Sequence, residues 1–144
     1  MKVLWTDGSA EPNPGKGGFA VIEVVGEEGR PVVLGLEEDS TNIRMEGNAL
    51  IAAIKYAGEE GCEIHTDSEF WINVLTKWAP TWQKNGWKKK TGPIKNLEIV
   101  QELFDLYCKY PVKLVWVRGH MGTKFNEMAD EWANRARIGE KVGD

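Results

Sequence analysis

Runs of apolar, β-prone residues separated by short polar turns dominate the first part of the chain. One run ends at Asp7, a turn rich in Pro, Asn and Gly follows, and a second run covers residues 19–25. Two such runs joined by a short turn that contains glycine predict a β-hairpin. After a further turn, residues 31–36 predict a third strand.

The pattern changes to a helical period after the polar residues 37–42. Residues 43–57 carry apolar side chains on two neighbouring stripes, which predicts a helix that is largely buried. Gly58 is a suitable residue to end this helix. Residues 62–66 predict a short strand and residues 69–75 the next helix, and a strand–helix–strand unit of this length implies parallel pairing within one sheet.

The rest of the chain adds further helices and one more strand. Asn96 is expected to cap a helix that ends near Tyr107, residues 112–117 predict a strand, and residues 125–138 predict the final helix. We interpret residues 78–92 as a basic loop and residues 139–144 as a frayed tail. The order β-β-β-α-β-α-α-β-α predicts an α/β protein with a mixed five-stranded sheet flanked by helices.

Length and composition are those of a single globular domain, residues 1–144, with 42% apolar and 28% charged residues. Asp7 interrupts the apolar start too early for a signal peptide, and no apolar run is as long as a membrane span. Cys62 and Cys108 have no paired spacing, which favours a reducing compartment. We therefore expect a cytoplasmic monomer that has no contact with a membrane.

Positive charge is concentrated in one segment. Residues 77–95 contain six lysines and no acid, and removing these six charges from the net charge of −4 leaves −10 on the rest of the chain. A basic patch on an acidic body predicts an anionic partner. Trp78, Trp82 and Trp87 alternate with the lysines, although Trp87 can serve the core alone. The tryptophans assigned to the core outright are Trp5, Trp71, Trp116 and Trp132.

Four acids lie at positions where a carboxylate can be functional. Asp7 and Asp67 follow strands, Glu46 is expected in the first turn of a mostly apolar helix, and Asp130 lies on the last helix. Each acid also has an ordinary explanation. Asp7 suits a turn, Glu46 the helix dipole, Asp67 a helix cap, and Asp130 a solvated helix face.

Taken together, the acids favour a metal site. Ligand sites in such sheets lie beyond the carboxyl ends of the strands, and two neighbouring carboxylates both ionise only if a cation lies between them. Hard oxygen ligands suit Mg²⁺ or Mn²⁺, and two such ions can hydrolyse a phosphodiester. Cys62 and His65 are a weaker metal candidate, because residues three apart on a strand point to opposite faces. A metal cluster beside a basic aromatic surface predicts a nuclease.

Four ordered motifs carry a resemblance to a known family. They are Thr6-Asp7-Gly8-Ser9 with Asn13-Pro14-Gly15, Thr41-Asn42 with Arg44-Met45-Glu46, Thr66-Asp67-Ser68, and Gly119-His120 with Asn126-Glu127 and Asp130. With these motifs the chain resembles type 1 ribonucleases H, in particular the bacterial form, over about residues 2–138. The resemblance implies the ribonuclease H-like fold and endonucleolytic cleavage of the RNA strand of RNA–DNA hybrids, which leaves 5′-phosphate and 3′-hydroxyl ends.

The resemblance also implies the roles of individual residues. Two Mg²⁺ ions, or Mn²⁺ in their place, would be held by Asp7, Glu46, Asp67 and Asp130, with Asp7 bridging them. His120 would assist proton movement or product release. The residues expected on the RNA strand are Gly8, Ser9, Asn13, Asn42, Ser68 and Glu69. Those expected on the DNA strand are Thr41, Arg44 and Asn96 at a phosphate, and Trp78, Trp82, Lys84, Lys88, Lys89 and Lys90 on a basic protrusion, residues 78–95.

Two positions depart from the family pattern. The family often has Asn or Gln where this chain has Ile43, and Gln where this chain has Glu69. An acid at position 69 would lie near substrate and metal. Its effect on substrate affinity and on metal preference therefore stays open.

Three alternative hypotheses remain. A binding module of the same fold that does not cut is disfavoured by the intact acids and His120. A domain cut from a longer polypeptide, such as a reverse transcriptase, is disfavoured by Met1 immediately before the first strand. Another nuclease or recombinase of this fold is disfavoured by the set Thr41, Arg44 and Asn96 together with the basic protrusion.

Overall fold

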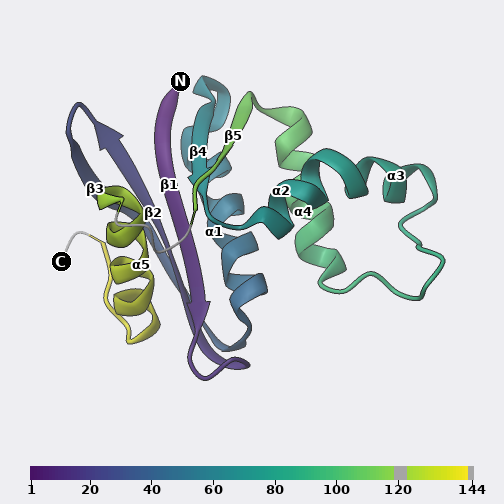
Figure 1. Ribbon diagram of the computed structural model, residues 1–144, viewed down its shortest axis with the longest axis horizontal. Coiled ribbons are helices and arrows are strands. Elements are labelled where there is room, and N and C mark those ends of the chain that lie inside the picture. Colours follow the sequence, from purple (N-terminus) through teal and green to yellow (C-terminus); the bar gives the residue numbers. More distant parts are fainter. Residues whose placement is uncertain (119–122, 143–144) are drawn as a thin grey trace.

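A mixed β-sheet forms the centre of the protein in the computed structural model, which describes residues 1–118 and 123–142 (Figure 1). Within these residues five strands lie in the order β3-β2-β1-β4-β5. The strands are β1 (Lys2–Ala10), β2 (Gly15–Val25), β3 (Glu28–Ser40), β4 (Cys62–Thr66) and β5 (Val112–Trp116). The pairs β1–β2 and β2–β3 are antiparallel, whereas β1–β4 and β4–β5 are parallel. The predicted mixed sheet and its parallel half are confirmed.

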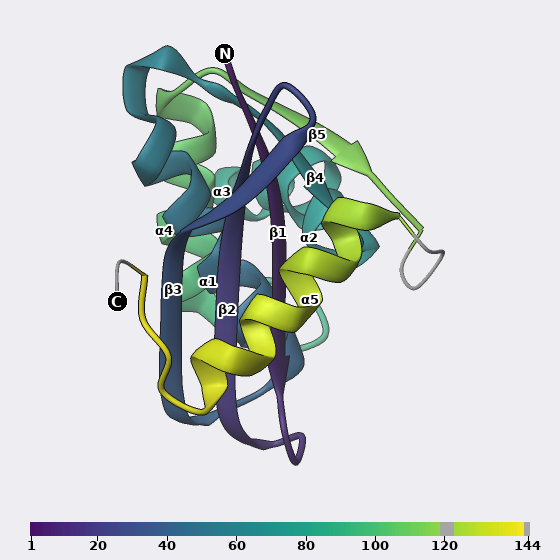
Figure 2. The same ribbon diagram turned by 90° about the vertical axis from the view of Figure 1, so that its left-hand side faces the viewer.

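Helices cover both faces of the sheet. Figure 2 shows α5 (Lys124–Arg137) crossing one face, with α1 (Asn42–Ala57) and α4 (Leu97–Lys109) behind the other. The turn η1 (Gly58–Glu60) follows α1. After β4 the chain continues through α2 (Glu69–Asn73), the π-helical turn η2 (Val74–Trp78) and α3 (Ala79–Lys84). In Figure 1, α3 and the loop after it project away from the sheet and form the predicted protrusion.

Two apolar clusters hold these layers together. The larger cluster lies between the sheet and helices α1 and α4, and it includes Leu4, Ile64, Leu50 and Leu103. The smaller one lies beneath α5 and contains Trp5, Ile22 and Ala129. Successive residues of β1, such as Leu4 and Trp5, therefore serve opposite faces, as the two-residue period of a strand requires.

Several predicted boundaries are wrong. The third strand runs over Glu28–Ser40 instead of residues 31–36, because an edge strand can carry polar residues on its solvent side. Residues 79–84 are helical instead of a loop. Pro80 lies at the start of α3, where its missing N–H is harmless. Asp7 does not end its strand, since β1 continues to Ala10, and Glu46 lies beyond the first turn of α1.

The tryptophans divide between the core and the surface. Trp5 and Trp71 are buried and Trp132 packs against the smaller cluster, as predicted. Trp87 packs edge-on against Phe104, so its predicted core role is also supported. The assignment of Trp116 to the core is wrong, because its side chain is 49% exposed at the end of the edge strand β5.

Among the helices within residues 1–118 and 123–142, none is both long and apolar enough to cross a membrane. Cys62 is buried in the larger cluster, whereas His65 stacks on Trp5 of the smaller one, with ring centroids 4.4 Å apart. The two residues therefore face different layers, as predicted. The single domain, the cytoplasmic location and the monomeric state stay predictions.

Candidate active site

Asp7 and Asp67 meet at the carboxyl end of the parallel strand pair. Register between β1 and β4 pairs Trp5 with His65, so continuation by two residues brings Asp7 opposite Asp67. Pairing of β4 with β1 stops at this point, while β1 continues alone beside β2. The sheet is therefore open beside Asp7, and the predicted meeting of the two aspartates is confirmed.

Glu46 reaches the two aspartates because α1 lies close against β1. A Cβ atom at position 8 would overlap the backbone of Met45 and Glu46, so the close approach requires Gly8. A ligand oxygen of each of the three carboxylates, from Asp7, Glu46 and Asp67, lies within 4.8 Å of the others. The three carboxylates, called the acid cluster below, therefore come from β1, from α1 and from the short segment between β4 and α2.

Burial and like charge raise the pKa values of Asp7 and Glu46. Asp7 is only 9% exposed, and desolvation followed by repulsion from Asp67 and Asp130 holds its pKa well above the ordinary value. The backbone N–H of Gly8 donates a hydrogen bond to its carboxylate at 2.9 Å, which partly offsets the shift. For Glu46, desolvation and the charge of Asp67 outweigh a hydrogen bond from Ser68 and raise the pKa to about 7.

Asp130 approaches the acid cluster from the opposite face of the sheet. It lies on α5 and raises the pKa of Asp7 through its charge and a side-chain hydrogen bond. One turn later on the same helix, Asn134 accepts a hydrogen bond from the Ser9 hydroxyl at 3.4 Å. Helix α5 is thereby fixed beside the strand that carries Asp7, and all four predicted acids lie around one end of that strand.

The donor set of the acid cluster fits a divalent cation. Carboxylate oxygens are the ligands that Mg²⁺ and Mn²⁺ prefer, and a cation among them would offset their mutual repulsion. Of the residues that the structure describes, Asp7, Glu46 and Asp67 are the group of three or more His, Cys, Asp or Glu close enough to share an ion. His120 lies outside the described residues, so its predicted role stays a prediction.

The residues predicted to meet the RNA strand join the first hairpin to α1. The amide oxygen of Asn42 accepts a hydrogen bond from the Ala10 N–H at 2.7 Å, and Asn13 accepts one from the Asn42 N–H at 3.1 Å. The Thr41 hydroxyl caps α1 by accepting a bond from the Arg44 N–H. These side chains therefore brace the edge of the site, and their predicted contacts with substrate stay predictions.

Ser68 and Glu69 start α2 directly after Asp67. The Ser68 hydroxyl accepts a hydrogen bond from the Trp71 N–H at 3.3 Å, which caps the helix. Glu69 is exposed in the first turn of α2, where its negative charge interacts favourably with the helix dipole. The departure at position 69 thus has a structural explanation within α2 itself.

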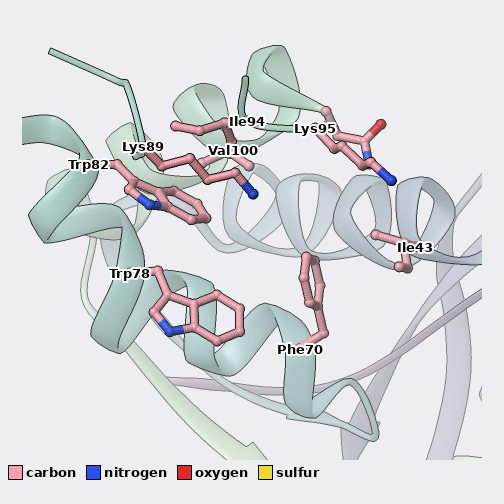
Figure 3. Close-up of a pocket in the computed structure, with 9 residues that line it drawn as sticks. Ile43, Phe70, Trp78, Trp82, Lys89, Ile94, Lys95 and Val100 are labelled. Carbon is pink, nitrogen blue, oxygen red and sulfur yellow. The ribbon is translucent and has the colours of Figure 1, made fainter. Parts of the chain in front are cut away.

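An aromatic pocket of about 360 Å³, whose lining side chains are drawn in Figure 3, is formed partly by residues close in sequence to Glu46 and Asp67. Its walls come from α1, α2, the protrusion and the start of α4. The lining residues are Ile43, Phe70, Trp78, Trp82, Lys89, Ile94, Lys95, Asn96 and Val100. Ile43 precedes Glu46 by one turn of α1, and Phe70 lies three residues after Asp67. The pocket and the acid cluster therefore share α1, and Asp67 lies two residues before α2, which carries Phe70.

The π-helical turn explains why Trp78 faces this pocket. Residues seven apart in a regular α-helix lie on the same side, so Trp78 would lie on the buried side of the helix together with Trp71. The Ala79 N–H instead bonds to the Val74 carbonyl, five residues earlier, which inserts one residue into the turn. Trp78 then lies near Phe70, with ring centroids 5.9 Å apart, and Trp82 follows at 6.2 Å from Trp78.

Arg44 and Asn96, both predicted at a DNA phosphate, contact each other. An Arg44 guanidinium nitrogen donates a hydrogen bond to the Asn96 side-chain oxygen at 3.2 Å. Asn96 stands before α4 in a left-handed conformation with φ of 56°, and its side chain makes no cap hydrogen bond. Asn96 therefore occupies the predicted N-cap position, and its backbone carbonyl accepts hydrogen bonds from the Ile99 and Val100 N–H groups, but its side chain binds Arg44 instead of capping α4.

The predicted lysines lie on the exposed protrusion. Lys84, Lys88, Lys89 and Lys90 are all exposed, and the last three line a second hollow together with Trp82. Trp78 is 40% exposed, which leaves its ring accessible from the pocket. These positions agree with a surface that meets an anionic partner.

Some residues of this surface did not emerge from the sequence pattern. Phe70 is 40% exposed in the pocket, whereas the adjacent Trp71 is buried, and the sequence pattern alone did not separate the two. Glu98 and Glu37 both contact Arg44. The contact with Glu98 had no signal, because Arg44 and Glu98 are 54 residues apart in the sequence.

Comparisons with known proteins agree with this geometry. The sequence profile of the RNase H family matches residues 1–138. A ribonuclease H of Dichelobacter nodosus is 42% identical over 136 residues, which cover 92% of this chain and 89% of that protein. A ribonuclease H of Hahella chejuensis is 40% identical over 144 residues, which cover 98% of this chain and 95% of that protein.

A solved structure shares the fold. LC9-RNase H1, described as a type 1 RNase H with the type 2 active-site motif, superposes with a TM-score of 0.77 at 26% identity. The match covers 99% of this chain and 76% of that one. The chain therefore belongs to the ribonuclease H family and is a hydrolase of this class. Members of the family degrade RNA in RNA–DNA hybrids by endonucleolytic cleavage and generally use a divalent metal.

Proposed function

We propose that this protein cuts the RNA strand of RNA–DNA hybrids by two-metal-ion hydrolysis, leaving 5′-phosphate and 3′-hydroxyl ends. The observation that carries the proposal is the acid cluster, three carboxylates within 4.8 Å of one another beside a basic aromatic pocket. Burial and the neighbouring acids raise the pKa values of Asp7 and Glu46, and a bound divalent cation would favour their ionised forms, which supports a metal site here.

Asp7, Glu46, Asp67 and Asp130 would hold the ions. Mg²⁺ is the expected metal and Mn²⁺ the alternative, since both prefer carboxylate oxygens. Bound divalent ions supply an activated water and stabilise the oxygen that leaves the phosphodiester. The carboxylate of Asp7 interacts electrostatically with both Asp67 and Asp130, which supports the bridging position for this carboxylate.

Each strand of the hybrid would meet a different part of the surface. The RNA strand would lie along the acid cluster, where donors and acceptors near the first hairpin meet 2′-hydroxyls. The residues proposed for this strand are Gly8, Ser9, Asn13, Asn42, Ser68 and Glu69. The DNA strand would cross the aromatic pocket, where rings contact sugar or base and lysines offset phosphate charge. The residues proposed for this strand are Thr41, Arg44, Asn96, Trp78, Trp82, Lys84, Lys88, Lys89 and Lys90.

A substrate-selectivity assay tests the function. A labelled RNA–DNA hybrid is incubated with the protein and Mg²⁺, with matched RNA–RNA and DNA–DNA duplexes and an EDTA sample as controls. We expect cleavage of the RNA strand in the hybrid alone, with no cleavage in EDTA. Tight binding of the hybrid without cleavage in Mg²⁺ or Mn²⁺ would point to a binding module instead.

The lysines of the protrusion provide a second test. Replacing Lys88, Lys89 and Lys90 by Ala should raise KM several-fold and flatten its salt dependence, with little change in kcat, because fewer counterions are released. The control replaces Lys109, Lys113 and Lys141, three exposed lysines elsewhere, and changes the net charge equally. Equal salt slopes for the two triple variants would mean that the protrusion does not meet the substrate.

A further inference from the structure

The guanidinium group of Arg44 faces two carboxylates at once. It donates a hydrogen bond to Glu98 on α4, and its Nε lies 3.5 Å from a carboxylate oxygen of Glu37 on β3. The Arg44 side chain is 27% exposed, so the group lies at the surface without being fully solvated. The local charge around this arginine is therefore negative.

This acidic group lies at the rim of the aromatic pocket. Asn96, which accepts a hydrogen bond from Arg44, lines the pocket together with Lys95 and Ile43. Ile43 precedes Arg44 directly in α1. A nucleic-acid strand that crosses the pocket would meet Arg44, and with it the two carboxylates that already occupy the guanidinium.

The two acids differ in how firmly they are held. Glu37 is 35% exposed and also accepts a hydrogen bond from the Ser40 hydroxyl at 2.7 Å. Glu98 is 66% exposed in the first turn of α4, and its side chain pairs with Arg44. Glu98 is therefore the acid that can leave Arg44 at little cost, because exposed ion pairs contribute little stability.

We propose that Glu98 is an internal competitor for the substrate: it occupies Arg44 in the free protein and is displaced by a phosphate of the DNA strand. This inference rests on the proposed function, since it concerns the same binding surface. A guanidinium presents the same planar set of donors to a carboxylate and to a phosphate, so both anions can use it in turn. The competition would weaken binding and leave the chemical step unchanged.

The test compares two variants of α4 that each remove one negative charge. Glu98→Gln removes the competitor, while Glu102→Gln, one turn later, removes an acid that pairs with Lys55 at 3.0 Å. Cleavage of a fluorescent hybrid in Mg²⁺ gives KM and kcat, and titration of a short single-stranded DNA in EDTA gives a Kd that does not depend on cleavage. Both are measured at low ionic strength, where surface charges are least screened.

We expect Glu98→Gln to lower KM and the Kd for DNA about two- to fivefold relative to Glu102→Gln, with kcat unchanged, as the strength of exposed ion pairs implies. In an Arg44→Ala background, the gain from Glu98→Gln should disappear. Arg44→Ala also shows whether the arginine contributes to DNA binding at all.

Equal effects of Glu98→Gln and Glu102→Gln would overturn the proposal, because they would reduce it to a general effect of charge. A higher KM in Glu98→Gln would also overturn it and would make Glu98 a residue that positions Arg44. A wild-type protein that binds DNA but does not cut hybrids would refute the proposed function. The DNA affinities would then still decide whether Glu98 competes.

Discussion

Glu23 and Asp7 are both buried acids of the same sheet, one on β2 and one on β1, but their surroundings differ in charge. Glu23 is 6% exposed and Asp7 is 9% exposed, so desolvation penalises the charged form of both. The pKa of Glu23 is nevertheless lowered, whereas the pKa of Asp7 is raised. Burial alone therefore does not explain the difference between them.

The partners of Glu23 explain its low pKa. The Tyr56 hydroxyl donates a hydrogen bond to the Glu23 carboxylate at 2.6 Å. The side-chain nitrogens of Lys2 and Arg30 lie 3.3 and 3.4 Å from oxygens of the same carboxylate. The hydrogen bond from Tyr56 is the largest cause of the shift. This end of the sheet thus balances a buried charge with groups of the chain itself.

For Asp7 the largest influences are instead burial and the neighbouring acids Asp67 and Asp130, which all raise its pKa. At Glu23 the protein stabilises a buried negative charge with two cationic side chains and one hydroxyl group. The same fold can therefore stabilise a buried acid with its own side chains. The raised pKa values of Asp7 and Glu46 are therefore the feature to explain, and the divalent cation proposed for this site would favour their ionised forms. Three predictions test this comparison, from the largest expected effect to the smallest.

The largest effect is expected for Asp67→Asn on activity. Loss of one proposed ligand should reduce Mg²⁺-dependent cleavage of the hybrid at least about 100-fold, since even outer-shell partners of metals contribute 10- to 100-fold. The fold should remain intact, as circular dichroism would show. Asp105→Asn, on the exposed side of α4, is the control and should keep full activity. An Asp67→Asn protein that cuts at the wild-type rate would refute the ligand assignment.

The second prediction concerns the stability of the metal-free protein. The pKa of Glu46 is raised from 4.5 to about 7, so its ionisation in the folded state costs stability. That cost is fully present above about pH 7 and is relieved as the pH falls towards 4.5. Glu46→Gln should therefore raise the free energy of unfolding by about 1–3 kcal/mol at pH 8, because one pKa unit equals about 1.4 kcal/mol.

Urea unfolding in EDTA at pH 8 and at pH 5 provides the measurement for Glu46→Gln. The advantage of the variant over the wild type should be smaller at pH 5. A variant that is less stable than the wild type at both pH values would contradict the electrostatic account of Glu46.

The smallest effect is expected for the surroundings of Glu23. Here the variant should lower the free energy of unfolding, whereas Glu46→Gln should raise it. The lowered pKa of Glu23 means that its contribution to stability is present above the ordinary value of 4.5 and is lost as the pH falls below it. Tyr56→Phe should destabilise the protein by about 1 kcal/mol at pH 7, because it removes a hydrogen bond to a charged group. Tyr107→Phe, at another half-buried helix position, is the control. An effect of Tyr56→Phe that does not shrink in acid would argue against the role of Glu23.

Much of the sheet and of the acid cluster could be predicted from the sequence, because local patterns define them. Alternating apolar runs indicate the strands, and the Asp7 and Asp67 positions follow from parallel strands that end at one edge. The register of β1 and β4 then brings the two aspartates together without further information.

The aromatic pocket could not be predicted in the same way, because it depends on contacts between distant elements. Pro80 and Gly86 look like loop residues, yet Pro80 starts α3 and a π-helical turn redirects Trp78. The contacts of Arg44 join α1 to β3 and α4, over as many as 54 residues of sequence. Trp116 is exposed for a similar reason, since the sequence does not say which strand end lies outside the layers.

The most direct test of the central claim is the response of thermal stability to Mg²⁺. A ligand that binds only the folded protein raises Tm in a concentration-dependent manner. We predict that the Tm of the wild type at pH 8 rises from EDTA to millimolar Mg²⁺, whereas the Tm of Asp7→Asn responds much less. An unchanged wild-type Tm, or an equal rise in Asp7→Asn, would contradict the claim that the acid cluster is built to hold a divalent cation.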